Sequence, residues 1–192
     1  IVAAMATYFT ALNDYQTAFM APTEILSRQH YEKIWPLLNK FGINVGLLTS
    51  SEARISGEKM SKKEFTGKIA AGKISIVIGT HSLIQKNIDF KKLALVIIDE
   101  QHRFGVNQRA ALANSHKPSA VNYVPHLLSM SATPIPRTLG LTIWGDLDLS
   151  IIEEMPKERK NIITKIASPS ERQKVYEFIK SEARKGRQAF IV

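Results

Sequence analysis

Residues 93–105 read Leu-Ala-Leu-Val-Ile-Ile-Asp-Glu-Gln-His-Arg-Phe-Gly, an apolar run that ends in two adjacent carboxylates. Six apolar residues without polar alternation predict a strand buried on both faces, as in a parallel sheet flanked by helices. Ligands of such sheets bind beyond the carboxyl ends of the strands, where Asp99 and Glu100 would lie. A carboxylate pair there suits a magnesium nucleotide, with Asp99 holding hydrated Mg²⁺ and Glu100 polarising the attacking water. A strand that simply ends in a solvated Asp-Glu turn explains these two residues equally well.

The two carboxylates open a longer motif, Asp-Glu-Gln-His-Arg-Phe-Gly-Val. Its first four residues are a variant of the Asp-Glu-x-His box of superfamily 2 helicases, and the longer motif resembles the RecG-type DNA helicases in particular. The transcription-repair coupling factors are similar but usually have Glu in place of Gln101. Three further blocks agree with the RecG-type pattern in order and spacing: residues 20–26 (Met-Ala-Pro-Thr-Glu-Ile-Leu), 78–85 (Ile-Gly-Thr-His-Ser-Leu-Ile-Gln) and 129–139 (Ser-Met-Ser-Ala-Thr-Pro-Ile-Pro-Arg-Thr-Leu). The resemblance runs along the whole chain.

This resemblance implies an α/β fold, in which a RecA-like parallel sheet flanked by helices forms the motor domain of a P-loop NTPase. It implies an ATP-dependent DNA helicase that uses ATP and Mg²⁺ for branch migration and for remodelling of stalled forks and Holliday junctions in DNA repair and recombination. The expected partner is branched, fork or junction duplex DNA, and the expected protein is monomeric and cytoplasmic. Two other functions stay open: a non-catalytic nucleic-acid-binding module, and the motor of a transcription-repair coupling factor.

The same resemblance assigns roles to individual residues. The expected catalytic residues are Asp99, Glu100, Gln101 and His102, of which the first two would bind ATP and, through water, Mg²⁺. The residues expected to couple the nucleotide site to the DNA grip are Ser131, Ala132 and Thr133. The residues expected to contact DNA phosphates are Pro22, Thr23, Gly79, Thr80 and His81. Each group also has a plain structural explanation, as a helix start, a strand-to-loop turn or a structural histidine.

Composition limits the class of protein. The chain has 192 residues, is 44% apolar and carries a net charge of +9, so it can bury one full core with some chain left over. Basic residues concentrate in segments 54–73 and 157–187, which favours a polyanion such as nucleic acid, although such runs are often only solvated surface. The absence of cysteine excludes disulfides and thiolate zinc sites. The uncharged segment 118–136 contains four prolines, and the N-terminus lacks the basic region of a signal peptide, so we expect no membrane partner.

Hydrophobic periodicity and turn residues predict alternating helices and strands. The predicted strands are residues 17–21, 43–49, 74–78, 93–98 and 126–130, with a sixth at the chain end, 188–192. The predicted helices are residues 1–12, 22–41, 61–71 and 168–183, and residues 137–152 are expected to form a helix, a turn and a short strand that ends near Glu154. Thr23 is the predicted N-cap of the second helix, and Pro36 is expected to kink or split it.

Residues 67–74, Gly-Lys-Ile-Ala-Ala-Gly-Lys-Ile, come close to the Walker A pattern, but Ile74 replaces the hydroxyl that must reach the metal. The segment also closes a helix before a strand, whereas a Walker loop opens a helix, so Gly72 is interpreted as a helix stop. The resemblance places the Walker A loop upstream of Ile1, and we therefore expect a piece of a longer protein that is inactive alone. We assign residues 1–154 to a first RecA-like domain without its Walker A loop, and residues 155–192 to a linker and the beginning of a second one.

Overall fold

The computed structural model describes residues 1–80, 83, 88–100, 125–132, 148–152, 154 and 162–191. The chain divides into two compact units, Ile1–Gly140 and Leu141–Val192, and each is described by itself. Within the described ranges, every helix is too short or too polar to cross a membrane. The domain boundary expected at residue 154 stays a prediction.

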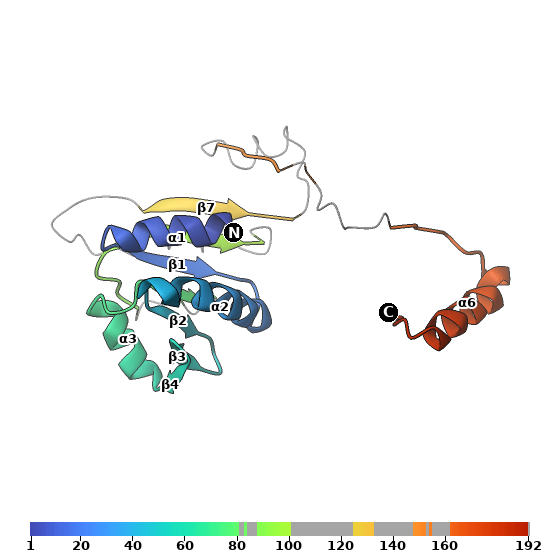
Figure 1. The fold of residues 1–192 in the computed structure, drawn as a ribbon, viewed down its shortest axis with the longest axis horizontal. Helices are drawn as coiled ribbons and strands as arrows, with labels where there is room; N and C mark the ends of the chain where they lie inside the picture. The colour runs from blue at the N-terminus through green and yellow to red at the C-terminus, as the bar shows by residue number, and fades with distance from the viewer. Residues whose placement is uncertain are drawn as a thin grey trace. The chain divides into compact units, whose positions relative to one another are not determined.

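A sheet of seven described strands forms the first unit (Figure 1). Its strands are β1 (Gln16–Met20), β2 (Val45–Leu48), β3 (Ala53–Ile55), β4 (Glu58–Met60), β5 (Ile76–Gly79), β6 (Leu93–Asp99) and β7 (His126–Met130). Their order is β4-β3-β2-β5-β1-β6-β7, in which β3 pairs antiparallel with both β2 and β4, and the other five strands pair in parallel. Strand β6 therefore has a parallel neighbour on each side, as its apolar run predicts, although β5 holds the middle position.

Helices flank this sheet, and two helical segments also occur in the described part of the second unit. Their bounds are α1 (Val2–Leu12), α2 (Glu24–Leu38), the 3-10 helix η1 (Asn39–Phe41) and α3 (Lys62–Ala70) in the first unit, and η4 (Pro169–Glu171) and α6 (Arg172–Arg184) in the second. Side-chain hydroxyls cap two of them, because Thr23 accepts a hydrogen bond from the Leu26 amide and Ser61 one from the Glu64 amide, each at 3.2 Å. These contacts satisfy amides that the first turn of a helix leaves unpaired.

Two hydrophobic clusters lie on the two faces of the sheet. Strand β1 shows the division, because Phe19 belongs to one cluster and Ala18 and Met20 belong to the other. Successive side chains of a strand point to opposite faces, and both faces of β1 are covered. Residues of α1 and α2 join the cluster of Phe19, whereas residues of α3 join the cluster of Met20. Burial on both faces explains why these strands read as continuous apolar runs.

Most predicted elements of the first unit are confirmed. The five predicted strands appear with ends shifted by at most two residues, and β7 has the predicted bounds. Gly72, with a φ of +75°, follows α3 and ends it, so the Walker-like segment 67–74 closes a helix rather than opening one. The expected split at Pro36 does not occur, because Pro36 lies in the last turn of α2, where it removes a single hydrogen bond. The antiparallel hairpin β3–β4 was not predicted.

The second unit confirms one predicted helix and corrects two predicted strands. Ser168 forms a capping box with Glu171 ahead of α6, and Gly186, with a φ of +78°, follows the helix. Residues 188–191 and 148–152 form no strand. A strand needs a hydrogen-bonded neighbour, and the described part of this unit offers none. The helix expected after residue 137 lies outside the described residues.

Candidate functional site

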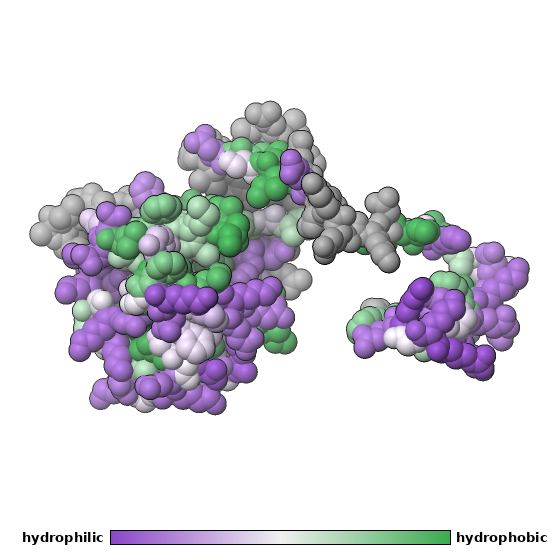
Figure 2. Space-filling model, viewed as in Figure 1, coloured by the Kyte–Doolittle hydropathy of each residue, from purple (hydrophilic) through white to green (hydrophobic). Residues whose placement is uncertain are grey.

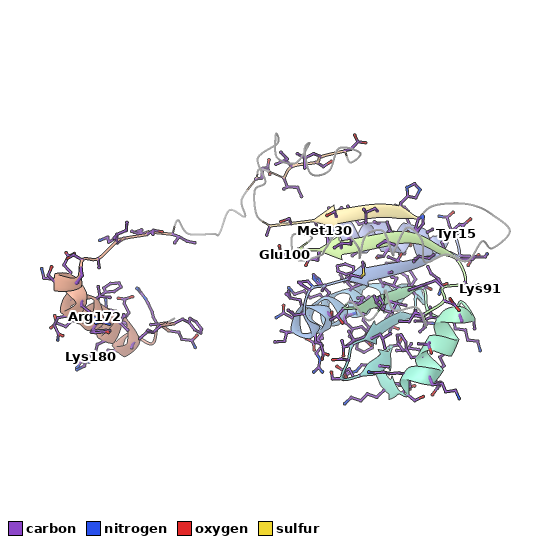
Figure 3. All side chains as sticks on the ribbon, turned by 180° about the vertical axis from the view of Figure 1, so that it is seen from behind. Tyr15, Lys91, Glu100, Met130, Arg172 and Lys180 are labelled. Carbon is purple, nitrogen blue, oxygen red and sulfur yellow. The ribbon has the colours of Figure 1, made fainter. Side chains whose placement is uncertain are left out.

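The carboxyl ends of four parallel strands meet at one edge of the sheet. Met20 at the end of β1 pairs with Gly79 of β5 on one side and with Ile98 of β6 on the other, and Asp99 pairs with Met130 of β7. Glu100 and Met130 lie at this edge, and Tyr15 and Lys91 lie at the opposite one (Figure 3). We call this edge the carboxyl edge. It is where open α/β sheets bind ligands.

Asp99 is held by the protein through both of its carboxylate oxygens. Its Oδ1 accepts a hydrogen bond from the Glu100 amide at 3.1 Å, and its Oδ2 lies 2.7 Å from Nε2 of His30. The side chain remains 20% exposed. Each carboxylate oxygen has two lone-pair sites, so Asp99 keeps acceptor capacity on the solvent side.

Glu100 has an unusual backbone conformation. Its φ is +54°, in the left-handed region that non-glycine residues rarely adopt. Such a conformation costs on the order of 1–3 kcal/mol and persists only when the surrounding structure imposes it, and such residues cluster at functional sites. The strain thus falls on the residue predicted to activate water.

These two residues fit a hydrated magnesium ion. Mg²⁺ in nucleotide sites usually keeps several waters and uses one or two carboxylates together with substrate phosphates. Asp99 and Glu100 supply two adjacent carboxylates at a strand end. Among the residues that the structure describes, no group of three or more His, Cys, Asp or Glu side chains could form a closed metal cage. Two adjacent carboxylates therefore suit a metal that arrives with its nucleotide.

His30 is a member of this site that the sequence analysis did not identify. It lies on α2, 69 positions from Asp99, and its ring packs against that of Phe19 with 4.7 Å between centroids. The available signal was its spacing: it follows the N-cap Thr23 by two helical turns, on the same side as the buried residues Ser27 and Tyr31. The position of a residue on a helical face does not indicate which strand residue it contacts.

Pro22 and Thr23 occupy the turn between β1 and α2. The Thr23 hydroxyl uses its oxygen to cap α2, which leaves its proton available for donation. Both residues are partly exposed at the positive end of the helix. This turn can donate hydrogen bonds to a phosphate, in addition to starting the helix.

Gly79 and Thr80 end β5 at the same edge. A Cβ at position 79 would overlap the Leu48 carbonyl oxygen and lie 3.1 Å from Cγ of Leu83. Close packing against β2 therefore requires glycine here, which is a structural reason that the sequence analysis did not consider. Thr80 is partly exposed beyond it.

A polar cluster that was not predicted lies beyond β2. Glu24 accepts hydrogen bonds from the Ser50 amide at 3.0 Å, from the Ser50 hydroxyl and from the Ser51 hydroxyl at 2.6 Å, and these bonds, led by that of the Ser50 side chain, lower the pKa of Glu24. Lys62 donates to the Ser50 carbonyl at 2.6 Å, and Lys68 pairs with Glu64 at 2.9 Å. These two basic side chains therefore have protein partners.

The structure describes some of the remaining predicted site residues. Gln101, His102, Thr133 and His81 lie outside the described residues. Ser131 and Ala132 are described and exposed, directly after β7. The structure thus brings together Asp99, Glu100 and the ends of β1, β5 and β7, and adds His30.

The sheet, with its parallel strand ends and flanking helices, places the chain in the RecA-like class of α/β proteins. The chain belongs to the DEAD/DEAH box helicase family, whose model matches residues 1–141.

Individual relatives are similar along nearly the whole chain. The ATP-dependent DNA helicase RecG of Aquifex aeolicus is 45% identical over 192 residues, which are 100% of this chain and 23% of that protein. The protein of the same name from Bacillus subtilis is 46% identical over 191 residues, 100% of this chain and 26% of the relative. A solved structure of RecG bound to a three-way DNA junction has a TM-score of 0.71 and 40% identity, and covers 92% of this chain and 22% of that one. The chain thus spans about a quarter of the length of these relatives.

Proposed function

We propose that this chain is the ATP-binding motor domain of a RecG-type DNA helicase, which couples ATP hydrolysis to branch migration and to remodelling of stalled forks and Holliday junctions. One observation supports this most directly: Asp99 and Glu100 end a strand immediately beside the strand that leads into Pro22 and Thr23. A motor must link a nucleotide site to a nucleic-acid site, and adjacent strand ends bring the two together. Since a similar protein has been solved on a three-way DNA junction, branched DNA is the proposed partner.

When bound, Mg²⁺ and ATP would together supply the electrophilic γ-phosphoryl group and the positive charge that stabilises its transfer. Asp99 would hold the hydrated metal through oxygens that His30 and the Glu100 amide fix in place. Glu100 would orient the attacking water and accept its proton as the bond between the γ-phosphoryl group and ADP breaks. Gln101 and His102 follow directly in the chain and complete the proposed catalytic group.

The proposed DNA contacts carry no means of reading base sequence. Pro22 and Thr23 offer a hydroxyl and helix-terminal amides. Gly79 and Thr80 lie at and just beyond the end of the neighbouring strand, and His81 follows them in the sequence. Such groups bind phosphates and fix the position of the duplex, whereas sequence is read by side chains that reach base edges in the grooves. The proposed binding is therefore insensitive to base sequence.

The proposed coupling residues Ser131, Ala132 and Thr133 follow β7. Because Met130 pairs with Asp99, Ser131 and Glu100 each directly follow a paired residue at the carboxyl edge. Hydroxyl groups both donate and accept, so they can exchange partners between two states of the nucleotide site at little cost. We also propose a monomeric, cytoplasmic protein, with residues 1–154 as the motor domain and 155–192 as the linker and beginning of a second RecA-like domain.

The test uses the full-length gene product and the substitution Glu100→Gln. The amide keeps the shape of the side chain but loses the charge that accepts the proton, so DNA-stimulated ATP hydrolysis should fall by at least about 100-fold. Binding of Mg-ATP should be largely retained, whereas Asp99→Ala should weaken it. The measurements are steady-state ATP hydrolysis and equilibrium nucleotide binding.

The matched control is Glu58→Gln, the same chemical change at an exposed position of β4, which should leave turnover unchanged. Near-normal hydrolysis by the Glu100→Gln protein would remove the catalytic assignment. Loss of hydrolysis in both variants would mean that the effect is not specific to the carboxyl edge.

A further inference from the structure

We infer that His30 is a positioning residue of the nucleotide site, which fixes the Asp99 carboxylate in the orientation that the magnesium water shell needs. This inference rests on the proposed function, because it assigns His30 a role only if Asp99 serves Mg-ATP. It adds a residue of α2 to a site otherwise built from strand ends.

The direction of the hydrogen bond follows from the chemistry of the two groups. An ionised carboxylate only accepts, so Nε2 of His30 carries the proton and donates it to Oδ2 of Asp99 at 2.7 Å. With the Glu100 amide on Oδ1, each oxygen of Asp99 has one fixed donor. Two donors on two oxygens set the plane of the carboxylate, and the remaining lone pairs point in defined directions. A carboxylate held in this way loses little freedom when it accepts water from a metal shell.

His30 is itself held from two sides. Its ring packs against Phe19, the penultimate residue of β1, which is 1% exposed, and its backbone belongs to a helix whose neighbouring residue Tyr31 is also buried. The His30 side chain is 25% exposed, so the pair lies at the rim of the core rather than on a freely moving surface. A short, stiff path therefore joins β1, α2 and Asp99. Partners that orient ligand side chains in this manner are worth about 10–100-fold in metal affinity.

The same helix begins at the proposed phosphate contact. Thr23 caps α2, and His30 follows it by two turns on the same helix. A hydrogen-bonded helix moves as a rigid element, so a shift of its first turn also shifts the donor at His30. Asp99 thus receives one of its hydrogen bonds from the element whose N-terminus is proposed to bind DNA.

The test compares two amides at position 30 in the full-length gene product. Gln places its side-chain nitrogen near the position of the histidine Nε2, whereas the shorter Asn cannot reach Asp99. The readout is binding of a fluorescent ADP analogue as a function of Mg²⁺ concentration, together with KM and kcat for ATP. His30→Asn should raise the Mg²⁺ concentration for half-maximal binding by about tenfold. His30→Gln should stay within about threefold of the wild type, and the exposed neighbour substitution Gln29→Ala should have no effect.

Thermal unfolding establishes whether each variant is folded. If the His30→Asn variant is not folded, the His30→Leu variant is used in its place. Leu keeps an apolar contact with Phe19 but cannot donate, so it should show the same tenfold effect. Wild-type Mg²⁺ dependence in a folded Asn or Leu variant overturns the inference, as does a Gln variant that binds as weakly as they do. If the wild-type protein itself shows no Mg²⁺-dependent nucleotide binding, the proposed function fails and this inference fails with it. If the wild type shows such binding and the variants show the same Mg²⁺ dependence, only the inference fails and the proposed function stands.

Discussion

The carboxyl edge and the opposite edge, where the parallel strands begin and which we call the amino edge, use polar residues in opposite ways. At the amino edge, the Gln16 residue is 3% exposed and its side-chain amide forms hydrogen bonds with the protein backbone. Its Nε2 donates to the Ile69 and Ile74 carbonyls at 3.1 and 2.9 Å, and its Oε1 accepts from the Lys92 amide at 3.0 Å. At the carboxyl edge, Asp99 and Thr23 are partly exposed and keep hydrogen-bonding capacity after their protein contacts are made.

This difference separates the polar residues that stabilise the sheet from the polar residues that can bind a ligand. A buried amide whose groups are satisfied by three backbone segments fixes those segments and has nothing left for a ligand. A partly exposed carboxylate with two protein contacts, or a hydroxyl with one, is oriented and can still bind a ligand. Substitutions at the amino edge should therefore change stability alone, and substitutions at the carboxyl edge should separate into those that affect stability and those that affect binding.

The largest expected effect on stability comes from Gly79→Ala. Gly79 lies at the carboxyl edge but is required for packing, so it is an exception to this division. The added methyl group would overlap the Leu48 carbonyl oxygen, so β2 and β5 must move apart. We expect a loss of about 3 kcal/mol in the free energy of unfolding.

Chemical unfolding measures that loss, and Gly67→Ala is its matched control. Gly67 is exposed within α3 with no atom within 4 Å of an added Cβ, so alanine there should stabilise the protein by about 0.5–1 kcal/mol. Two alanine substitutions with effects of the same sign and size would contradict the packing argument.

A smaller effect is expected from Gln16→Leu at the amino edge. The substitution leaves two buried carbonyls and one amide without the side-chain partner, and should cost about 2 kcal/mol. Nucleotide and DNA affinity of the folded protein should stay as in the wild type. Urea unfolding and equilibrium binding check both statements, and reduced Mg-ATP affinity at full folding would show that the two edges are not independent.

The smallest effect on stability is expected from Thr23→Ala, which removes the N-cap of α2 and should cost about 1 kcal/mol. DNA affinity should fall to a similar degree on unrelated sequences, since the proposed contact is to phosphate. Thr23→Ser keeps both the cap and the hydroxyl and should restore stability and affinity together. Fluorescence anisotropy with duplexes of matched length measures the affinity; unchanged DNA binding by the alanine variant would limit Thr23 to its structural role.

Elements with strong local signals could be predicted from the sequence. The apolar run of β6, the cap at Thr23 and the helix stop at Gly72 are each determined by nearby residues. The hairpin β3–β4 gave no such signal, because its strands have three residues each, β4 carries two exposed charges, and the pairing of β3 depends on β2. The predicted strand at residues 188–192 failed for the related reason that a strand exists only with a partner.

The candidate site shows the same limit. Asp99 and Glu100 were predicted because a buried strand that ends in carboxylates is a local pattern. The contact of His30 with Asp99 joins residues 69 positions apart, and it depends on how α2, which packs mainly against β2 and β5, reaches Phe19 of β1 and Asp99 of β6. No spacing along the chain expresses that packing, so the residue most directly bonded to Asp99 was missed.

The unpredicted hairpin has a consequence for how the molecule meets others of its kind. An open sheet edge with free amides and carbonyls is a template for strands of neighbouring chains, and natural proteins blunt such edges with short, charged strands. Strand β4, the outermost on its side, has three residues, and two of them are the exposed Glu58 and Lys59. The Tyr31 hydroxyl accepts the Gly57 amide at 2.8 Å, which holds the tip of the hairpin against α2. The hairpin therefore ends the parallel sheet in a form that resists aggregation through this edge.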